Sequence, residues 1–256
     1  MWRLLRITLL LLVLALAVGQ TWLDRIRTQS WQQTLWVGIY PLNGDGSPVA
    51  QRYVDSLKTE DFTDIERFFA WQAHRYGVTI DEPIHVELYP SPAQPPPMLP
   101  PDPGIAQTVW WSLKLRWYAH GAASTPGRPP PHIRVFVLYH DPATSPSVPH
   151  SLGLQKGLIG VVYAFADRFA RGSNSIVIAH ELMHTLGATD KYDPQTDAPL
   201  YPTGFAEPSR KPLYPQLLAE IMAGRRPLSR TEFEMPDNLR DVVVGPVTAA
   251  EIHWIR

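Results

Sequence analysis

Four stretches of the chain combine β-branched and aromatic residues in the way that is typical of β-strands. In residues 84–89 apolar and polar positions alternate, whereas residues 35–40 and 133–139 are mostly apolar. The last of the four contains Gly160, which indicates a bulge or a position at the edge of a sheet. The predicted strands are Leu35–Tyr40, Ile84–Tyr89, Ile133–Tyr139 and Leu158–Phe165.

In other stretches apolar residues recur three or four positions apart, and this spacing predicts helices. One such stretch ends at Gly77, a residue that commonly ends a helix. In another, Val109, Leu113 and Trp117 lie four residues apart. The serines at 173 and 175 are candidates for the N-cap of a third helix. The predicted helices are Thr59–Tyr76, Thr108–Tyr118, Ser173–Leu186, a short one near Leu213–Ala219, and a closing one from about Val247 to Ile255.

The predicted order is therefore strand, helix, strand, helix, strand, strand, helix, followed by irregular chain. The 27 prolines favour long irregular connections, above all the proline-dense loops at 90–103 and 126–131. This order predicts an α/β layer followed by a smaller irregular part, and we expect residues 34–256 to form a single domain. We expect an upper layered part at 34–187, a smaller loop-rich lower part at 188–256 that ends in a helix, and a cleft between them.

The N-terminus has the pattern of an export signal. Arg3 and Arg6 precede an apolar run at 7–18, and small residues at 17–19 offer a cleavage position. At about 12 residues the run is shorter than the roughly 20 that span a bilayer as a helix. Residues 1–19 are predicted to be a cleaved signal peptide or a short signal anchor, and residues 20–33 a linker. The remainder is expected outside the cytoplasm: secreted, periplasmic, or tethered to a membrane.

Composition narrows the chemistry. A formal net charge of −1 leaves no surplus of positive charge to neutralise phosphates, so nucleic acid is not an expected partner. The chain has no cysteine, so any metal site must be built from His, Asp or Glu.

The predicted helix at 173–186 carries two histidines four residues apart. On a helix His180 and His184 lie on one face, about 5–6 Å apart at Cβ, so both imidazoles can bind one Zn²⁺. Glu181, the next residue round the helix, is placed to orient a water molecule and take its proton. The other side chains of this helix are largely apolar. Two histidines and a glutamate buried there without partners would cost several kcal/mol, and a bound cation removes that cost.

Gly187 follows this helix and allows the chain to turn. If the helix continued, residue 190 would lie about 9 Å along its axis from His184 and could not bind the same ion. Glycine accepts the left-handed conformation that ends a helix, and the turn can bring Asp190 back to the metal. Two histidines and one carboxylate would leave a fourth tetrahedral position for water, as in catalytic zinc sites.

The stretch from His180 to Asp190 resembles the extended zinc motif of the metzincin metallopeptidases, HExxHxxGxxH/D, in its snapalysin-like aspartate version. Downstream, Ala219–Gly224 (AEIMAG) is similar to the metzincin Met-turn, with Met222 as its methionine. The resemblance implies an α+β fold with a twisted mixed sheet, two or three helices above the cleft and an irregular lower part that ends in a helix. It also implies a zinc-dependent endopeptidase in which Glu181 and zinc activate the attacking water.

The same resemblance implies that the strand at 158–165 is an edge strand that pairs with an extended peptide or protein substrate. No tyrosine stands shortly after Met222, where several family members have one, so Tyr192 or Tyr201 is a candidate to stabilise the oxyanion. A monomer is expected.

Two alternatives stay open at the level of sequence. In a different class of zinc peptidase the third ligand is a glutamate on a later helix, and Glu207 and Glu220 are the candidates. The other alternative is a non-catalytic, envelope-tethered protein with a structural metal held by four protein ligands.

Overall fold

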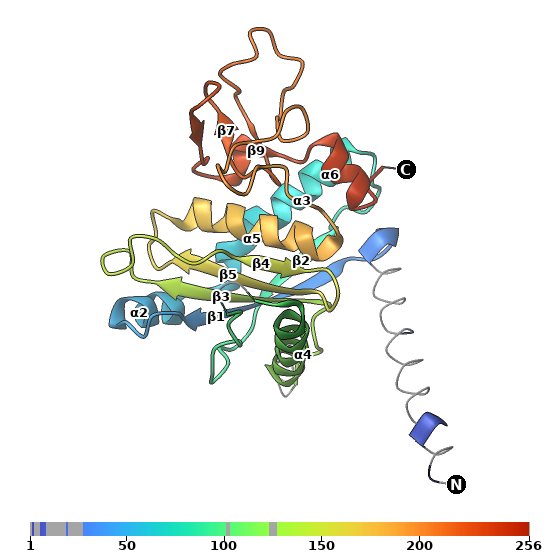
Figure 1. Ribbon diagram of the computed structural model, residues 1–256, viewed down its shortest axis with the longest axis vertical. Helices are drawn as coiled ribbons and strands as arrows, with labels where there is room; N and C mark the ends of the chain where they lie inside the picture. Colours follow the sequence, from blue (N-terminus) through green and yellow to red (C-terminus); the bar gives the residue numbers. More distant parts are fainter. Residues whose placement is uncertain are drawn as a thin grey trace.

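The computed structural model describes residues 2, 6–8, 19, 28–100, 103–122 and 127–255. A five-stranded mixed sheet forms its centre, in the order β2-β1-β3-β5-β4 (Figure 1). The first four of these strands are parallel, and only β4 runs antiparallel to its neighbour. The strands are β1 (Leu35–Asn43), β2 (Ile84–Leu88), β3 (Ile133–His140), β4 (Leu152–Leu154) and β5 (Ile159–Phe165).

Four helices pack around this sheet, and parallel strands need such crossover connections. They are α2 (Pro48–Ser56), α3 (Thr63–Arg75), α4 (Ile105–Ala122) and α5 (Arg171–Leu186). A 3₁₀ turn at Thr59–Phe62 precedes α3, so the predicted helix at 59–76 is present but divided. The α+β class and all four predicted strands are confirmed: β1 extends three residues beyond its predicted end, and the other three strands differ from the prediction by one residue.

Alternating side chains of β1, β3 and β5 enter two separate cores. Val135 and Val137 of β3 belong to the larger core, which includes residues of α2, α3 and α5. Phe136 and Leu138 point to the other face and join a smaller core beneath α4. The sheet therefore separates α4 on one side from α5 on the other (Figure 1).

The edge of the sheet differs from the prediction. β5 was expected at the edge, but it lies between β3 and β4, and its Gly160 sits in regular pairing with Gly153. The edge strand is β4, which has three residues and is too short to show a recognisable pattern in the sequence.

The lower part is mostly irregular and lies above α5 in the view of Figure 1. Two small pairs of strands and two short helical segments stabilise it. They are β6 (Ala219–Glu220) with β9 (Val242–Val243), β7 (Arg226–Pro227) with β8 (Phe233–Glu234), the 3₁₀ turn Leu239–Asp241, and α6 (Pro246–Glu251). The prediction of a helix near Leu213–Ala219 is wrong, since Pro212 and Pro215 cannot donate helical hydrogen bonds. The closing helix is shorter than predicted.

The predicted export signal lies largely outside the described residues. The end of the predicted linker is not free: Trp31 is buried against Trp254, and its indole N–H donates to the carbonyl of Ile252 at 2.7 Å. In the part of the chain that is described, no helix combines the length and the apolar character needed to cross a bilayer.

Candidate metal centre

The centre is built at the C-terminal half of α5. Ten of the side chains of α5 are buried, so the helix is held on nearly every side. Its N-cap is Ala170 rather than either predicted serine, because Ser173 donates its hydroxyl to the Ala170 carbonyl and Ser175 is buried. At the other end Gly187 has φ of 110°, and the amides of Gly187 and Ala188 bond back to the carbonyls of His184 and Met183. Gly187 thus ends the helix in the left-handed backbone conformation, which glycine adopts more readily than other residues.

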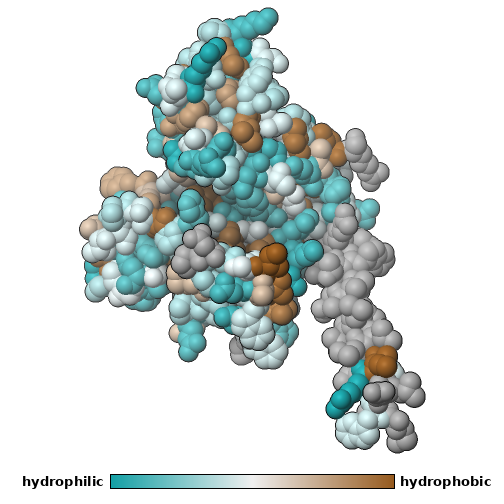
Figure 2. All heavy atoms as spheres, viewed as in Figure 1, coloured by the Kyte–Doolittle hydropathy of each residue, from teal (hydrophilic) through white to brown (hydrophobic). Residues whose placement is uncertain are grey.

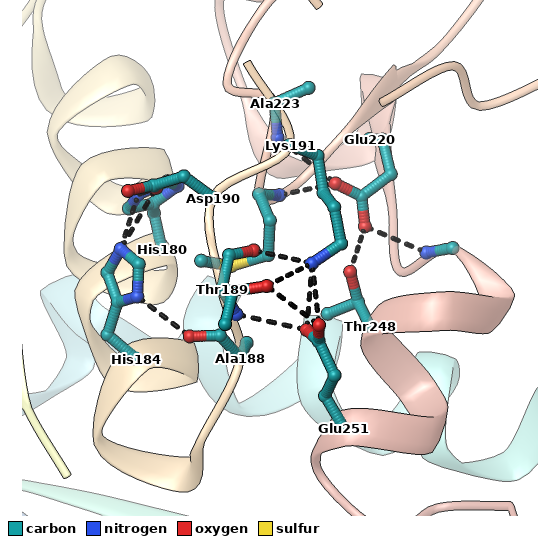
Figure 3. A network of polar contacts seen from close by, with 12 residues as sticks. His180, His184, Ala188, Thr189, Asp190, Lys191, Glu220, Ala223, Thr248 and Glu251 are labelled. Atoms are coloured by element: carbon teal, nitrogen blue, oxygen red, sulfur yellow. Dashed lines mark hydrogen bonds and ion pairs between the residues drawn. The ribbon is translucent and has the colours of Figure 1, made fainter. Parts of the chain in front are cut away.

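The turn after Gly187 brings three ligand atoms together. The Nε2 atoms of His180 and His184 lie 3.1 Å apart, and Asp190 Oδ1 lies 3.2 and 3.1 Å from them (Figure 3). Two atoms bound at about 2.0–2.1 Å to one tetrahedral zinc ion would be about 3.3 Å apart. The triangle therefore has the size that a single zinc ion requires, slightly contracted.

Hydrogen bonds to carbonyls fix the orientation of both imidazoles. His180 Nδ1 lies 2.9 Å from the carbonyl oxygen of Ile221, and His184 Nδ1 lies 2.9 Å from that of Ala188. A carbonyl oxygen only accepts, so each Nδ1 carries a proton, and Nε2 is the atom of each ring that faces Asp190 and is left to take a second proton or a cation. Second partners of this kind orient metal-binding histidines in general. Three lone-pair acceptors at this separation repel one another unless a cation or a proton lies between them.

The ionisation of the group follows from this crowding. Burial acts to raise the pKa of Asp190, but hydrogen bonds to His180 and His184 outweigh it and hold that pKa well below its usual range. Burial acts to lower the pKa of His180, yet the hydrogen bond to Asp190 and the charge of Glu181 raise it. The carboxylate thus stays ionised and ready to bind a cation.

Glu181 lies beside this triangle without joining it. Its side chain is 4% exposed, and its Oε2 atom has no hydrogen-bond partner in the structure. Burial raises the pKa of Glu181, while the two neighbouring histidines partly offset the effect. A buried carboxylate oxygen without a partner is rare and needs an explanation. An acceptor of this kind beside three potential metal ligands suits a water molecule held between them.

Strand β4 crosses directly over the site at Gly153. A Cβ atom there would collide with the Glu181 carbonyl and would lie 2.6 Å from His184 Cβ. Only glycine lets the edge strand approach α5 this closely. The sequence pattern did not reveal this contact, although a glycine between two leucines was its one visible sign.

A cluster of polar groups around the buried Lys191 fixes the loop that carries Asp190. The amide and hydroxyl of Thr189 donate to Glu251 of α6, at 3.0 and 2.7 Å (Figure 3). The ammonium of Lys191, whose side chain is buried, contacts both Glu251 oxygens at 2.8 and 2.9 Å and the Thr189 carbonyl at 2.7 Å. The amide of Lys191 donates to the carbonyl of Met222. The sequence analysis did not assign Lys191 and Glu251 to the site. Their partners are either far away in the sequence or belong to no recognisable motif.

The predicted Met-turn lies against the same loop, and Glu220 organises it. Met222 is fully buried, and the residue before it, Ile221, supplies the carbonyl that accepts from His180. The carboxylate of Glu220 accepts from the amides of Met222, Ala223 and Gly245 and from the hydroxyl of Thr248. Both Glu220 oxygens are therefore engaged in shaping the turn.

The two glutamates considered as alternative third ligands are thus placed elsewhere. Glu220 is occupied as described, and Glu207 accepts from the amide of Leu217 and pairs with Arg210. Among the described residues, the group that can share one ion with His180 and His184 contains Asp190 alone.

Of the two candidate tyrosines, Tyr192 is the nearer to the site. Its ring centroid is 6.4 Å from that of His180, and burial raises its pKa, so the hydroxyl stays protonated. Tyr201 is 63% exposed and its hydroxyl lies 3.5 Å from the Pro208 carbonyl.

Two other features of the described chain are distinct from this centre. A cavity of about 340 Å³ lies between the end of α2 and the start of α5 and is lined by Tyr53, Lys58 and Arg171 among others. His85 lies near Glu66 and Glu82, but its Nδ1 is 2.8 Å from Glu82, which an ordinary hydrogen bond explains.

The chain matches no protein-family model and no curated protein. The residues of the centre therefore supply the evidence on function.

Proposed function

We propose that this protein is a zinc-dependent endopeptidase of the metzincin type, with His180, His184 and Asp190 as metal ligands and Glu181 as general base. One observation carries the proposal. Three ligand atoms converge at 3.1–3.2 Å beside a buried glutamate oxygen that has no partner among the described residues. The mixed sheet, the helix ended by Gly187 and the buried turn at Met222 agree with what the resemblance implies.

The ligand set favours a catalytic site over a structural one. Structural zinc sites have four protein ligands, whereas catalytic sites have three and an open position. No fourth His, Asp or Glu of the described chain joins the group, and the Asp190 side chain is 43% exposed. The site is therefore accessible from solvent on the side of Asp190.

The residues around the centre divide the chemical work. Zinc bound here would polarise the carbonyl of the peptide bond that is cleaved. Glu181 is placed to take a proton from the attacking water and to deliver it to the leaving amine. Tyr192, as a neutral donor, could stabilise the charge that develops on the carbonyl oxygen.

The edge of the sheet offers a place for substrate. β4 pairs with β5 on one side only, which leaves its other edge free to bond an extended peptide. Gly153 brings that strand against Glu181 and His184, so a peptide aligned along β4 would pass next to the base. This replaces the predicted role of residues 158–165.

The experiment compares the whole protein with Glu181→Gln. Zinc content is measured after dialysis, and hydrolysis is measured on a mixed library of quenched fluorescent peptides. The proposal predicts one zinc per chain in both proteins and a loss of at least about 1,000-fold in hydrolysis for the variant. Equal hydrolysis by the two zinc-loaded proteins would exclude Glu181 as the base.

A further inference from the structure

Helix α4 has two apolar faces, of which only one is covered. Trp111, Leu115 and Ala119 face the sheet and are buried in the smaller core. The other face exposes five large apolar side chains, each between 52% and 87% exposed. They are Ile105, Val109, Trp110, Leu113 and Trp117.

These five side chains lie on one side of the helix. At about 100° per residue, they fall within a sector about 140° wide that is roughly opposite the buried face, and the exposed Arg116 and His120 lie in the same sector. Met98, in the loop before α4, is exposed as well. In Figure 2 brown side chains gather over the position of α4. Single exposed apolar residues are normal on soluble proteins, but five large ones on one side of a helix indicate a binding surface.

The charges next to this surface select the kind of partner. Lys114 and Arg116 are exposed and lie on opposite sides of the group formed by Trp110, Leu113 and Trp117, and residues 105–122 contain no Asp or Glu. Tryptophans on an apolar helix face with lysine and arginine beside them are typical of helices that lie in the interface of a bilayer. A second copy would fit poorly, because α4 paired with α4 would bring cations together with no acidic partner on the helix.

We propose that α4 lies flat on a bilayer that contains anionic lipids, with Trp110, Leu113 and Trp117 inserted among the acyl chains and Lys114 and Arg116 at the headgroups. The apolar run at 7–18, predicted as a signal anchor, would supply a second attachment to the same membrane. Two weak attachments are what stable anchoring requires. In Figure 1 residues 6–8 and α4 both lie on the lower side of the molecule.

This orientation has a consequence for the candidate centre. The sheet separates α4 from α5, so the three ligand atoms lie on the side of the sheet that faces away from the proposed membrane (Figure 1). Membrane binding through α4 would leave β4 and the Asp190 loop accessible to a water-soluble substrate. The inference does not depend on peptidase activity, since it rests on residues that take no part in the centre.

The absence of cysteine allows a direct test on the whole chain. A nitroxide spin label is attached to Leu113→Cys or, as the control, to Arg230→Cys in the loop between β7 and β8, at the other end of the molecule (Figure 1). Each protein is reconstituted in vesicles of phosphatidylcholine with about 30% phosphatidylglycerol, and the accessibility of the label to oxygen and to a water-soluble nickel complex is measured. The proposal predicts that the label at 113 gains oxygen accessibility and is shielded from nickel, while the label at 230 stays in water.

Charge reversal tests the headgroup contacts. Lys114→Glu with Arg116→Glu should weaken the insertion of the label at 113 at least about tenfold on anionic vesicles. It should leave the unfolding midpoint and the zinc content unchanged. Insertion unaffected by the charge reversal would remove anionic lipid from the proposal.

Three results would overturn the inference. The first is that the label at 113 stays in water when vesicles are present. The second is that the label is already shielded in lipid-free protein that sedimentation shows to be a dimer, which assigns the surface to a second copy. The third is that the label is shielded in lipid-free monomer, which assigns the surface to another segment of the chain.

Discussion

Helices α4 and α5 lie on opposite faces of one sheet, and both are rich in apolar residues. In α5 nearly every side is covered: Glu181 is buried, and the side chains of His180 and His184 are only 13% and 18% exposed. In α4 only one side is covered, and large apolar residues stand in solvent. The comparison shows that similar apolar content can serve two ends: in α5 it surrounds a polar group, and in α4 it forms a surface.

The largest effect should come from removing a candidate metal ligand. His184→Ala and Asp190→Ala each delete one corner of the triangle, so zinc affinity should fall at least about 100-fold, with hydrolysis of the peptide library lost at low zinc. Competition with a fluorescent chelator measures this. Asp197→Asn is the matched control, because Asp197 forms a surface ion pair with Arg225 and should bind zinc as the wild type does. If Asp190→Ala bound zinc as tightly as the wild type does, the third ligand would have to be another residue.

Replacing a leucine should destabilise the protein more on the buried face of α4 than on its exposed face. Leu115 is fully buried and Leu113 is 52% exposed. Leu115→Ala should lower the free energy of unfolding by about 3 kcal/mol, and Leu113→Ala by less than about 0.5 kcal/mol. Urea unfolding of both variants in lipid-free buffer is the measurement. Similar losses for the two would mean that the outer face is covered in the free protein.

The cluster that holds the Asp190 loop should have a smaller, pH-dependent effect. Burial acts to raise the pKa of Glu251, but hydrogen bonds from Lys191 and Thr189 outweigh it and lower it below its ordinary value of 4.5. A carboxylate with a lowered folded-state pKa stabilises the fold fully above that ordinary value and loses the contribution as pH falls through the folded-state pKa. Glu251→Gln should therefore cost about 2 kcal/mol at pH 7, and the difference from the wild type should shrink below about pH 4.5.

Unfolding at a series of pH values checks this sign. A difference that grows as the solution is acidified would show that Glu251 is not held as an ion by Lys191.

The smallest effect concerns the glycine that ends α5. Gly187 and Gly77 both have positive φ, at 110° and 76°, so alanine at either position should cost about 1 kcal/mol of stability. Only at Gly187 would a Cβ approach a neighbour, Gln155 Nε2 at 2.5 Å, and only there does the loop lead to Asp190. Gly187→Ala should thus weaken zinc binding a few-fold while Gly77→Ala leaves it unchanged. Equal zinc affinities of the Gly187→Ala and Gly77→Ala variants would show that the turn at Gly187 does not position Asp190 for metal binding.

The sequence was informative wherever structure depends on neighbouring residues. The strands at 35–40 and 133–139 and the helix with His180 and His184 follow from local patterns, and Gly187 signals the turn. Chain segments of two or three residues, such as β4, have no readable period, and β4 was missed. Leu213–Ala219 was wrong because its apolar content was given more weight than its prolines.

The supporting shell of the site could not be predicted from pattern. Thr189 and Glu251 are 62 residues apart, and nothing in either neighbourhood signals the other. The apolar spacing of Val109, Leu113 and Trp117 did predict a helix, but these residues turned out to be its exposed face. Periodicity shows which residues share a face and leaves open whether that face meets a core.

The central claim is that one zinc ion binds between α5 and the loop after Gly187. X-ray absorption at the zinc edge of the whole protein, loaded with one equivalent and dialysed, tests it most directly. The account predicts retained zinc with two imidazole nitrogens and additional oxygen ligands at about 2.0 Å. A protein that retains no zinc, or zinc without imidazole scattering, would contradict it.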